Sequence, residues 1–259
     1  MILATYNMFG GMKGNSLVSN IAAHYYFYIK NSFKQVIKRV TNLEEVKLLI
    51  KESNADILCV NEVIYELQKD EVSNFLLSLG YKTIIINKSS DRKNYFNLCT
   101  ILASKHDGNE LEIDIKKENA LLKEGSLCAI EITSKNIIAI GVHLALSKKY
   151  RLAQLKQIAN FIGPYKISGK NIFIMGDFNE TNYKLQKYAE FRKMNLTSCK
   201  VPTYPSIPLF EWMKRDYDHI FHTQHHKINR VETRKGSSDH FLLKFDIIPI
   251  DQESIEKLN

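Results

Sequence analysis

The chain has 259 residues, of which 44% are hydrophobic and 25% charged, and this suits one large globular domain or two small ones. It has only 11 Gly and 5 Pro, and no low-complexity tract or linker separates two halves, so we predict a single domain over residues 1–259. The 36 Lys and Arg exceed the 28 Asp and Glu by 8, a basic balance that favours polyanionic partners, nucleic acid first and anionic membrane second.

The sequence predicts neither a membrane-spanning helix nor a signal peptide. No apolar run approaches the ~20 residues that a bilayer requires, and the first residues lack a positively charged lead and a small-residue cleavage site. The cysteines have no CxxC or Cys/His metal spacing, and three of them lie inside apolar runs. This pattern favours buried free thiols in a reducing compartment, so we predict a cytoplasmic protein.

Strands and helices alternate in the first part of the chain. A helix is indicated where apolar residues recur at helical spacing, and a buried strand where they form a short continuous run. The predicted elements are a strand over 2–6, a helix over 33–52, a strand over 56–60 and a helix over 65–79, which ends at Gly80.

The middle and the end of the chain are richer in strands. Five strand-like segments come first, at 81–87, 97–104, 111–116, 126–133 and 136–144. They are followed by a helix over 151–162 that Gly163-Pro164 should stop, a strand over 170–175, a helix over 182–194, and strands over 217–222, 227–234 and 240–247. We therefore predict an α/β layered architecture with mixed sheets; helices outside two stacked sheets would give four layers.

Short polar clusters close or open the predicted strands. They are Thr5 to Asn7, Cys59 to Glu62, Gly141 to His143, Gly176 to Asn179, Asp216 to Asp218, and Ser238 to His240. Acidic, amide and imidazole groups at strand ends converge at one edge of a sheet. There they can hold a divalent cation, orient a water molecule and protonate a leaving oxygen.

The order and residue types of these clusters resemble the endonuclease/exonuclease/phosphatase superfamily, over roughly residues 2 to 246. The resemblance implies the deoxyribonuclease I fold, a four-layer α/β/β/α sandwich of two stacked mixed, largely antiparallel sheets. It also implies metal-dependent hydrolysis of a phosphoester. The cofactor it implies is Mg²⁺, with Mn²⁺ as an alternative, because a hard carboxylate such as Glu62 suits an ion that prefers oxygen donors.

The resemblance also assigns roles to individual residues. Glu62 matches the metal-binding glutamate, with the matches of Asn7 and Asp239 close by. Asp177 resembles the aspartate that orients or deprotonates the attacking water. Asn179, two residues further along an extended segment, would point to the same face and hydrogen-bond the phosphate.

Two histidines complete the implied site. His240 matches the histidine that contacts the scissile phosphate, and Asp218 matches the carboxylate that fixes its tautomer and favours the imidazolium. His143 matches the second histidine of the deoxyribonuclease-like and sphingomyelinase-like branches. Since other residues fill that position in apurinic-site endonucleases, His143 disfavours that branch.

Our leading hypothesis for the substrate is DNA or RNA, because the basic charge favours a polyanion. The expected phosphate contacts are Lys148, Lys149, Arg151 and Lys13, which follow the strand ends that carry the site. The alternative is a phosphatase or phosphodiesterase that acts on a phospholipid, a phosphoinositide, a small nucleotide or a tyrosyl-DNA adduct. A degenerate, purely binding member is a third hypothesis, disfavoured because every catalytic position is intact.

Overall fold

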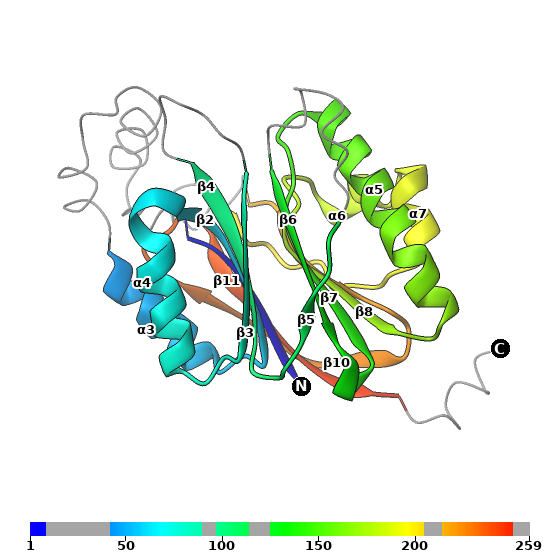
Figure 1. Ribbon diagram of the computed structural model, residues 1–259. Helices are drawn as coiled ribbons and strands as arrows, with labels where there is room; N and C mark the ends of the chain where they lie inside the picture. Colours follow the sequence, from blue (N-terminus) through cyan, green and yellow to red (C-terminus); the bar gives the residue numbers. More distant parts are fainter. Residues whose placement is uncertain (9–41, 90–96, 114–124, 205–213, 251–259) are drawn as a thin grey trace.

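Two β-sheets pack face to face, with helices on the outer side of each (Figure 1). The computed structural model describes residues 1–8, 42–89, 97–113, 125–204 and 214–250. Three apolar clusters define the layers: one between the two sheets, and one beneath each group of helices. The predicted four-layer α/β/β/α sandwich is therefore confirmed.

The first sheet has six strands within the described residues, in the order β10-β11-β1-β2-β4-β3. They are β1 (Ile2–Asn7), β2 (Ile57–Ile64), β3 (Thr83–Lys88), β4 (Leu98–Ser104), β10 (His226–Lys235) and β11 (Phe241–Pro249). Only β1 and β2 pair in parallel, and the other pairs are antiparallel. The helices α3 (Leu43–Ser53) and α4 (Tyr65–Ser78) cover its outer face.

The second sheet has the order β5-β6-β7-β8-β9. Its strands are β5 (Asn109–Glu110), β6 (Ser126–Ile132), β7 (Ile137–His143), β8 (Asn171–Asp177) and β9 (Asp218–His222). Here β7 and β8 are the parallel pair. The helices α5 (Lys148–Ile167), α6 (Asn182–Leu185) and α7 (Ala189–Met194) cover the outer face.

The alternation of side chains along the strands explains why both faces of each sheet are apolar. In β1, Leu3 packs into the layer between the sheets, whereas Ala4 and Tyr6 pack against the helices. A strand that is buried on both faces has no polar side to present, so it forms a nearly continuous apolar run. Consequently most of the polar residues that could form a site lie at or near the strand ends.

The helical predictions were wrong at two places. The helix α5 does not stop at Gly163-Pro164 but continues to Ile167. Pro164 lies in its last turn, where the missing N–H removes only one intrahelical hydrogen bond. The predicted helix over 182–194 is two short helices, α6 and α7, because Leu185 and Phe191 are both buried yet would lie about 120° apart on one helix.

Other predicted boundaries shift by a few residues. The strand predicted over 56–60 extends through Glu62 to Ile64. Of the strand predicted over 111–116, residues 111–113 are not in a strand, which lies just before them as the two-residue β5 at 109–110, and residues 114–116 lie outside the described residues. Residues 33–41 of the first predicted helix lie outside the described residues, and α3 begins at Leu43. No helix in the described part of the chain is both long and apolar enough to cross a membrane.

Candidate active site

The two parallel strand pairs bring their polar ends to the same edge of the sandwich. In the first sheet Asn7 is the register partner of Asn61, which precedes Glu62. In the second sheet His143 is the register partner of Asp177, and Asp177 in turn faces Asp218 across the antiparallel pair β8–β9. Strand register therefore places Asn7 near Glu62 in the first sheet, and His143, Asp177 and Asp218 side by side in the second.

A backbone irregularity directs Glu62 into the site. The pairing of β2 with β4 shifts register between Val60 and Val63, so that β2 has one residue more than its partner. Within that bulge Glu62 has a φ of 58°, in the left-handed region that non-glycine residues rarely adopt. Such a conformation stores strain, and strained residues of this kind concentrate at functional sites.

Asn7 joins the carboxylates of the two sheets. Its Nδ2 donates to Glu62 Oε1 at 3.0 Å and to Asp177 Oδ2 at 2.9 Å. His143 Nε2 lies 3.5 Å from the same Glu62 oxygen. The potential ligand atoms of Glu62, His143 and Asp177 all lie within 4.8 Å of one another.

This arrangement fits a divalent cation. The carboxylates of Glu62 and Asp177 supply the hard oxygen donors that Mg²⁺ prefers, and the Nδ2 group of Asn7 holds the two side by side. Asp239, the third predicted ligand, is placed differently. It is buried and belongs to neither of the acidic and imidazole groups that could share an ion, and its Oδ1 lies 3.4 Å from Ser238 Oγ. Its charge nevertheless contributes to the elevated pKa of His240.

His240 and Asp218 form a buried pair. Nδ1 of His240 lies 2.7 Å from Asp218 Oδ2, which leaves Nε2 directed toward Asp177 Oδ2, 4.0 Å away. Burial disfavours the charged ring, but the charge of Asp218 and its hydrogen bond prevail and raise the pKa of His240 well above the ordinary value. The predicted contact between the two side chains is thus present, and it favours the charged form of His240.

The pKa of the Asp177 carboxyl group is subject to opposing effects. Burial and the negative charge of Asp218 raise this pKa, whereas His240, His143 and the backbone N–H of Asn179 act to lower it. The net effect is an elevated pKa. A carboxylate whose ionised form is disfavoured is a stronger base toward a nearby water molecule than an exposed one.

Asn179 does not continue an extended strand, as the sequence had suggested. Its φ is 50°, and its backbone N–H donates to Asp177 Oδ1 at 2.7 Å. Its side-chain Nδ2 donates to the carbonyl of Leu144 at 2.8 Å. The chain turns here because an Asn tolerates the left-handed conformation, and the turn holds both Asp177 and the segment after His143.

Sequence reasoning missed a buried polar row beneath the site. Asn61 Nδ2 donates to the carbonyl of Val142, next to His143, and Asn61 Oδ1 accepts from Thr100 Oγ1 at 2.9 Å. Thr100 Oγ1 lies 2.6 Å from Ser126 Oγ. These groups connect β2 and β4 of one sheet with β6 and β7 of the other. The available signal in the sequence was Asn61, a polar residue that directly follows the apolar run of β2.

Tyr204 is a further missed neighbour of the site. Its ring centroid lies 4.8 Å from that of His240, and it stacks on Tyr217 at 5.5 Å. Burial, followed by the charge of Asp239, raises the pKa of the Tyr204 hydroxyl to about 12. The phenol therefore stays neutral and closes one side of the His240 ring.

The comparison with protein families agrees with this geometry. The endonuclease/exonuclease/phosphatase family matches residues 4–240 of this sequence, which span every strand that carries the site. The chain belongs to the endonuclease/exonuclease/phosphatase family. Members of this family are hydrolases that act on phosphoester bonds, and they generally depend on a divalent metal.

Solved structures of low sequence identity share the family fold. An endonuclease/exonuclease/phosphatase from Beutenbergia cavernae is 12% identical, with a TM-score of 0.69 over 96% of this chain and 71% of that chain. The human Nocturnin catalytic domain is 17% identical, with a TM-score of 0.60 over 96% and 93%. A mannosyl-6-phosphatase from Bacteroides thetaiotaomicron is 14% identical, with a TM-score of 0.59 over 96% and 99%. No curated protein matches the sequence.

In this family member the predicted phosphate contacts divide into three groups. Lys148 and Lys149 are exposed in the first turn of α5, as a phosphate contact requires. Lys13 lies outside the described residues. Arg151 is buried, so the predicted contact with substrate is incompatible with its position.

Arg151 instead ties together the two loops that follow His143 and Asp177. Its Nη1 donates to the carbonyls of Ala145 and Leu146, both at 2.8 Å, and its Nη2 donates to Glu180 Oε2 at 2.7 Å. Tyr188 Oη also donates to Glu180 Oε2, at 3.0 Å. Both partners of the ion pair have side chains only 6% exposed, so the pair is fully internal.

We expect Arg151→Met to lower the free energy of unfolding by about 3 kcal/mol, because it leaves the Glu180 carboxylate buried without its main partner. The matched control is Arg230→Met, since Arg230 pairs with Glu232 at 2.8 Å but has a side chain 72% exposed. That control should change the free energy by less than about 1 kcal/mol. Urea denaturation measures both, and equal losses would contradict the assignment.

Proposed function

We propose that this protein is a Mg²⁺-dependent phosphodiesterase, and specifically a nuclease that hydrolyses DNA or RNA. The observation that supports the proposal best is the position of Asp177. One of its oxygens, Oδ2, accepts a hydrogen bond from Asn7 in the group that contains Glu62, and also faces Nε2 of His240. A base, a candidate metal group and a charged imidazole thus meet around one carboxylate, as phosphoester hydrolysis requires.

In the proposed mechanism Glu62 and Asn7 would hold the Mg²⁺ ion, with Asp239 and His143 nearby. When bound, the ion neutralises charge on the phosphate oxygens and supplies electrophilic activation. Asp177 accepts a proton from the attacking water, and the backbone N–H of Asn179 fixes its second oxygen at 2.7 Å. The second hydrogen of the Asn179 amide group is assigned to a phosphate oxygen.

The histidines are proposed to have separate tasks. His240, kept charged by Asp218, donates from Nε2 to the phosphate and stabilises the negative charge of the transition state. His143, on the side of Glu62, is assigned to protonate the leaving oxygen. The proton taken up by Asp177 and the proton released by His143 balance in each turnover.

The deciding experiment is a substrate panel with purified protein and Mg²⁺. It compares labelled single- and double-stranded DNA, RNA, bis-p-nitrophenyl phosphate, a small nucleotide, a tyrosyl-DNA adduct and phosphoinositide vesicles. We expect the highest kcat/KM on a polynucleotide, and complete loss with EDTA. Higher kcat/KM on the nucleotide, the adduct or the lipid would replace the nuclease proposal with the corresponding alternative.

Glu62→Gln tests the metal site within the same panel. Because the substitution removes a charged ligand but keeps the shape, it should lower the rate and raise the Mg²⁺ concentration needed for half-maximal activity. Glu71→Gln, on the exposed surface of α4, is the matched control and should change neither quantity. Full activity in chelator, or an unchanged Mg²⁺ requirement in Glu62→Gln, would refute the metal assignment.

A further inference from the structure

The two outer helical layers have opposite charge. The helices α5, α6 and α7 contain eight basic residues and one acidic residue, whereas α3 and α4 contain three basic and six acidic residues. The basic set is Lys148, Lys149, Arg151, Lys156, Lys166, Lys184, Arg192 and Lys193, and Glu190 is the one acid. Over the 20 residues of α5 there is no carboxylate at all. Among the described helices, the positive charge is therefore concentrated in the layer over the second sheet.

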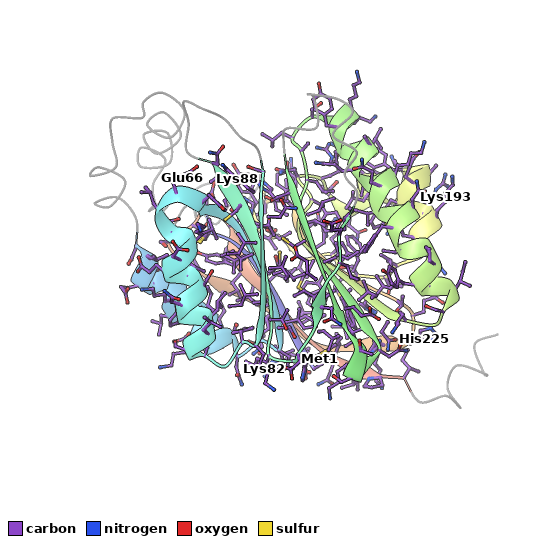
Figure 2. The ribbon with its side chains drawn as sticks, in the orientation of Figure 1. Met1, Glu66, Lys82, Lys88, Lys193 and His225 are labelled. Atoms are coloured by element: carbon purple, nitrogen blue, oxygen red, sulfur yellow. The ribbon has the colours of Figure 1, made fainter. Side chains whose placement is uncertain are left out.

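The charge of this layer is presented to solvent. Lys149 and Lys156 are exposed on α5, and Arg192 and Lys193 are exposed on α7. Among the described residues no carboxylate pairs with any of these four. Figure 2 shows Lys193 on the outer side of the molecule, away from the sheets. Of the acids that follow α5, Asp177 is buried, and Glu180 is buried but pairs with the exposed Lys184 at 3.3 Å, so it offsets one cation of this layer and none of the four named above.

The helices of this layer form one continuous face. Lys166 Nζ on α5 donates to the carbonyl of Met194, at the end of α7, at 2.7 Å. On the short segment between α6 and α7, the exposed Lys187 lies over the ring of Tyr183 of α6, with Nζ 3.9 Å from the ring centroid. We call the exposed cations of α5 to α7, together with Lys187, the basic face.

The basic face begins at the edge of the candidate active site. His143 ends β7, and α5 starts five residues later with Lys148 and Lys149. Two cations in the first turn are repelled by the positive end of the helix dipole, and no acid there offsets them. Residues that oppose local stability in this way are expected where a ligand needs them. From there α5 runs about 30 Å along the protein surface.

We propose that the basic face binds the sugar–phosphate backbone of a nucleic acid strand whose scissile phosphate lies at Asp177. This rests on the proposed nuclease function and extends it, because it assigns affinity to contacts well beyond the reacting bond. An anionic membrane fits less well. The exposed apolar residues Leu146 and Ile167 lie before the first residue and at the last residue of α5, so they form no patch that could insert.

The test uses a variant in which Lys156, Lys187, Arg192 and Lys193 are all changed to Gln. The matched control changes Lys51, Lys82, Lys227 and Arg230 to Gln, which removes the same charge from exposed positions outside the basic face. Each is measured on a 30-nucleotide substrate and on bis-p-nitrophenyl phosphate, across monovalent salt. Binding of the same oligonucleotide is measured with Asp177→Asn as the background, so that affinity is read without cleavage.

We expect the basic-face variant to bind the oligonucleotide at least tenfold more weakly. Its slope of log affinity against log salt should be shallower by about 3, since each lost phosphate contact removes roughly 0.7–0.9. The control should keep the slope of the wild type, and both variants should hydrolyse bis-p-nitrophenyl phosphate at the wild-type rate because that compound is too small to reach the basic face.

The outcomes separate the two proposals. Cleavage of nucleic acid with an unchanged salt slope in the basic-face variant overturns the basic face and leaves the nuclease function intact. If the oligonucleotide binds, binding weakens in the basic-face variant, and the wild type does not cleave it, the basic face is supported as a nucleic-acid surface and the nuclease function is overturned. If the Asp177→Asn protein does not bind the oligonucleotide even at low salt, the basic face is overturned as a nucleic-acid surface. The same conclusion follows if the basic-face variant no longer sediments with phosphatidylserine vesicles but still binds the oligonucleotide as the wild type does.

Discussion

Asp177→Asn should lower kcat by about 10²–10⁴-fold, the usual contribution of a positioned general base. The substitution keeps the shape of the side chain and leaves an oxygen that can accept from Asn7 or from the backbone of Asn179, as Asp177 does now. It removes the carboxylate that would accept the proton of the attacking water. A rate within tenfold of wild type on the preferred substrate would exclude Asp177 as the base.

The same substitution should not destabilise the metal-free protein. Burial and the charge of Asp218 raise the pKa of the Asp177 carboxyl group, so folding disfavours its charged form at neutral pH. A neutral Asn should therefore leave the melting temperature unchanged or raise it. Asp216→Asn is the matched control, because Asp216 is also buried but accepts from Asn182 N at 3.1 Å, away from the acidic cluster. Its kcat should stay within a few-fold of wild type.

Replacing either member of the Asp218–His240 pair should also abolish most activity, and the double replacement should cost little more than either single one. Residues that act as a unit give losses that do not add. Asp218→Asn removes the charge that keeps His240 protonated, and His240→Ala removes the donor itself. Additive losses in the double variant would show that the two side chains act separately.

Stability distinguishes the single variants from the double. His240→Ala leaves the Asp218 carboxylate buried with a charge and no imidazole, and we expect it to lower the free energy of unfolding by about 3–5 kcal/mol. Adding Asp218→Asn removes that charge, so the double variant should regain part of this stability while remaining inactive. Denaturation and kinetics of the four proteins measure the two quantities independently.

His143→Ala serves as the comparison for this pair. If His143 protonates the leaving oxygen, its loss should reduce cleavage of an oligonucleotide far more than cleavage of bis-p-nitrophenyl phosphate, whose leaving group needs little protonation. The Asp218 and His240 variants should be impaired on both substrates, since charge stabilisation at the phosphate is needed in each case. Equal loss on both substrates in His143→Ala would remove it from the leaving-group role.

The sequence predicted that polar clusters at the strand ends would lie together at one sheet edge. It did not predict the parallel pairs, β1 with β2 and β7 with β8, that bring Asn7 beside Asn61 and His143 beside Asp177. What it could not supply was the way the chain turns at those ends. The left-handed backbone of Glu62 and Asn179 depends on a bulge and on hydrogen bonds that form only after the strands have paired.

The position of Arg151 was misjudged although a signal for it existed. Arg151, Leu155, Ile158 and Ile162 recur at helical spacing and are all buried, so Arg151 belongs to the inward stripe of α5. Its place after two lysines suggested a surface role instead. The internal partner, Glu180, is 29 residues away in sequence, and such a pairing becomes visible only in three dimensions.

The candidate catalytic groups are divided between the two sheets. Asn7, Glu62 and His240 belong to strands of one sheet or to its strand ends, whereas His143, Asp177 and Asp218 belong to the other. Neither sheet by itself carries both Asp177, the proposed base, and His240, the imidazole that pairs with Asp218. Under the proposed mechanism, enzymatic activity therefore requires that the two sheets are docked. A species in which either sheet has folded alone, or has separated from its partner, would show no turnover.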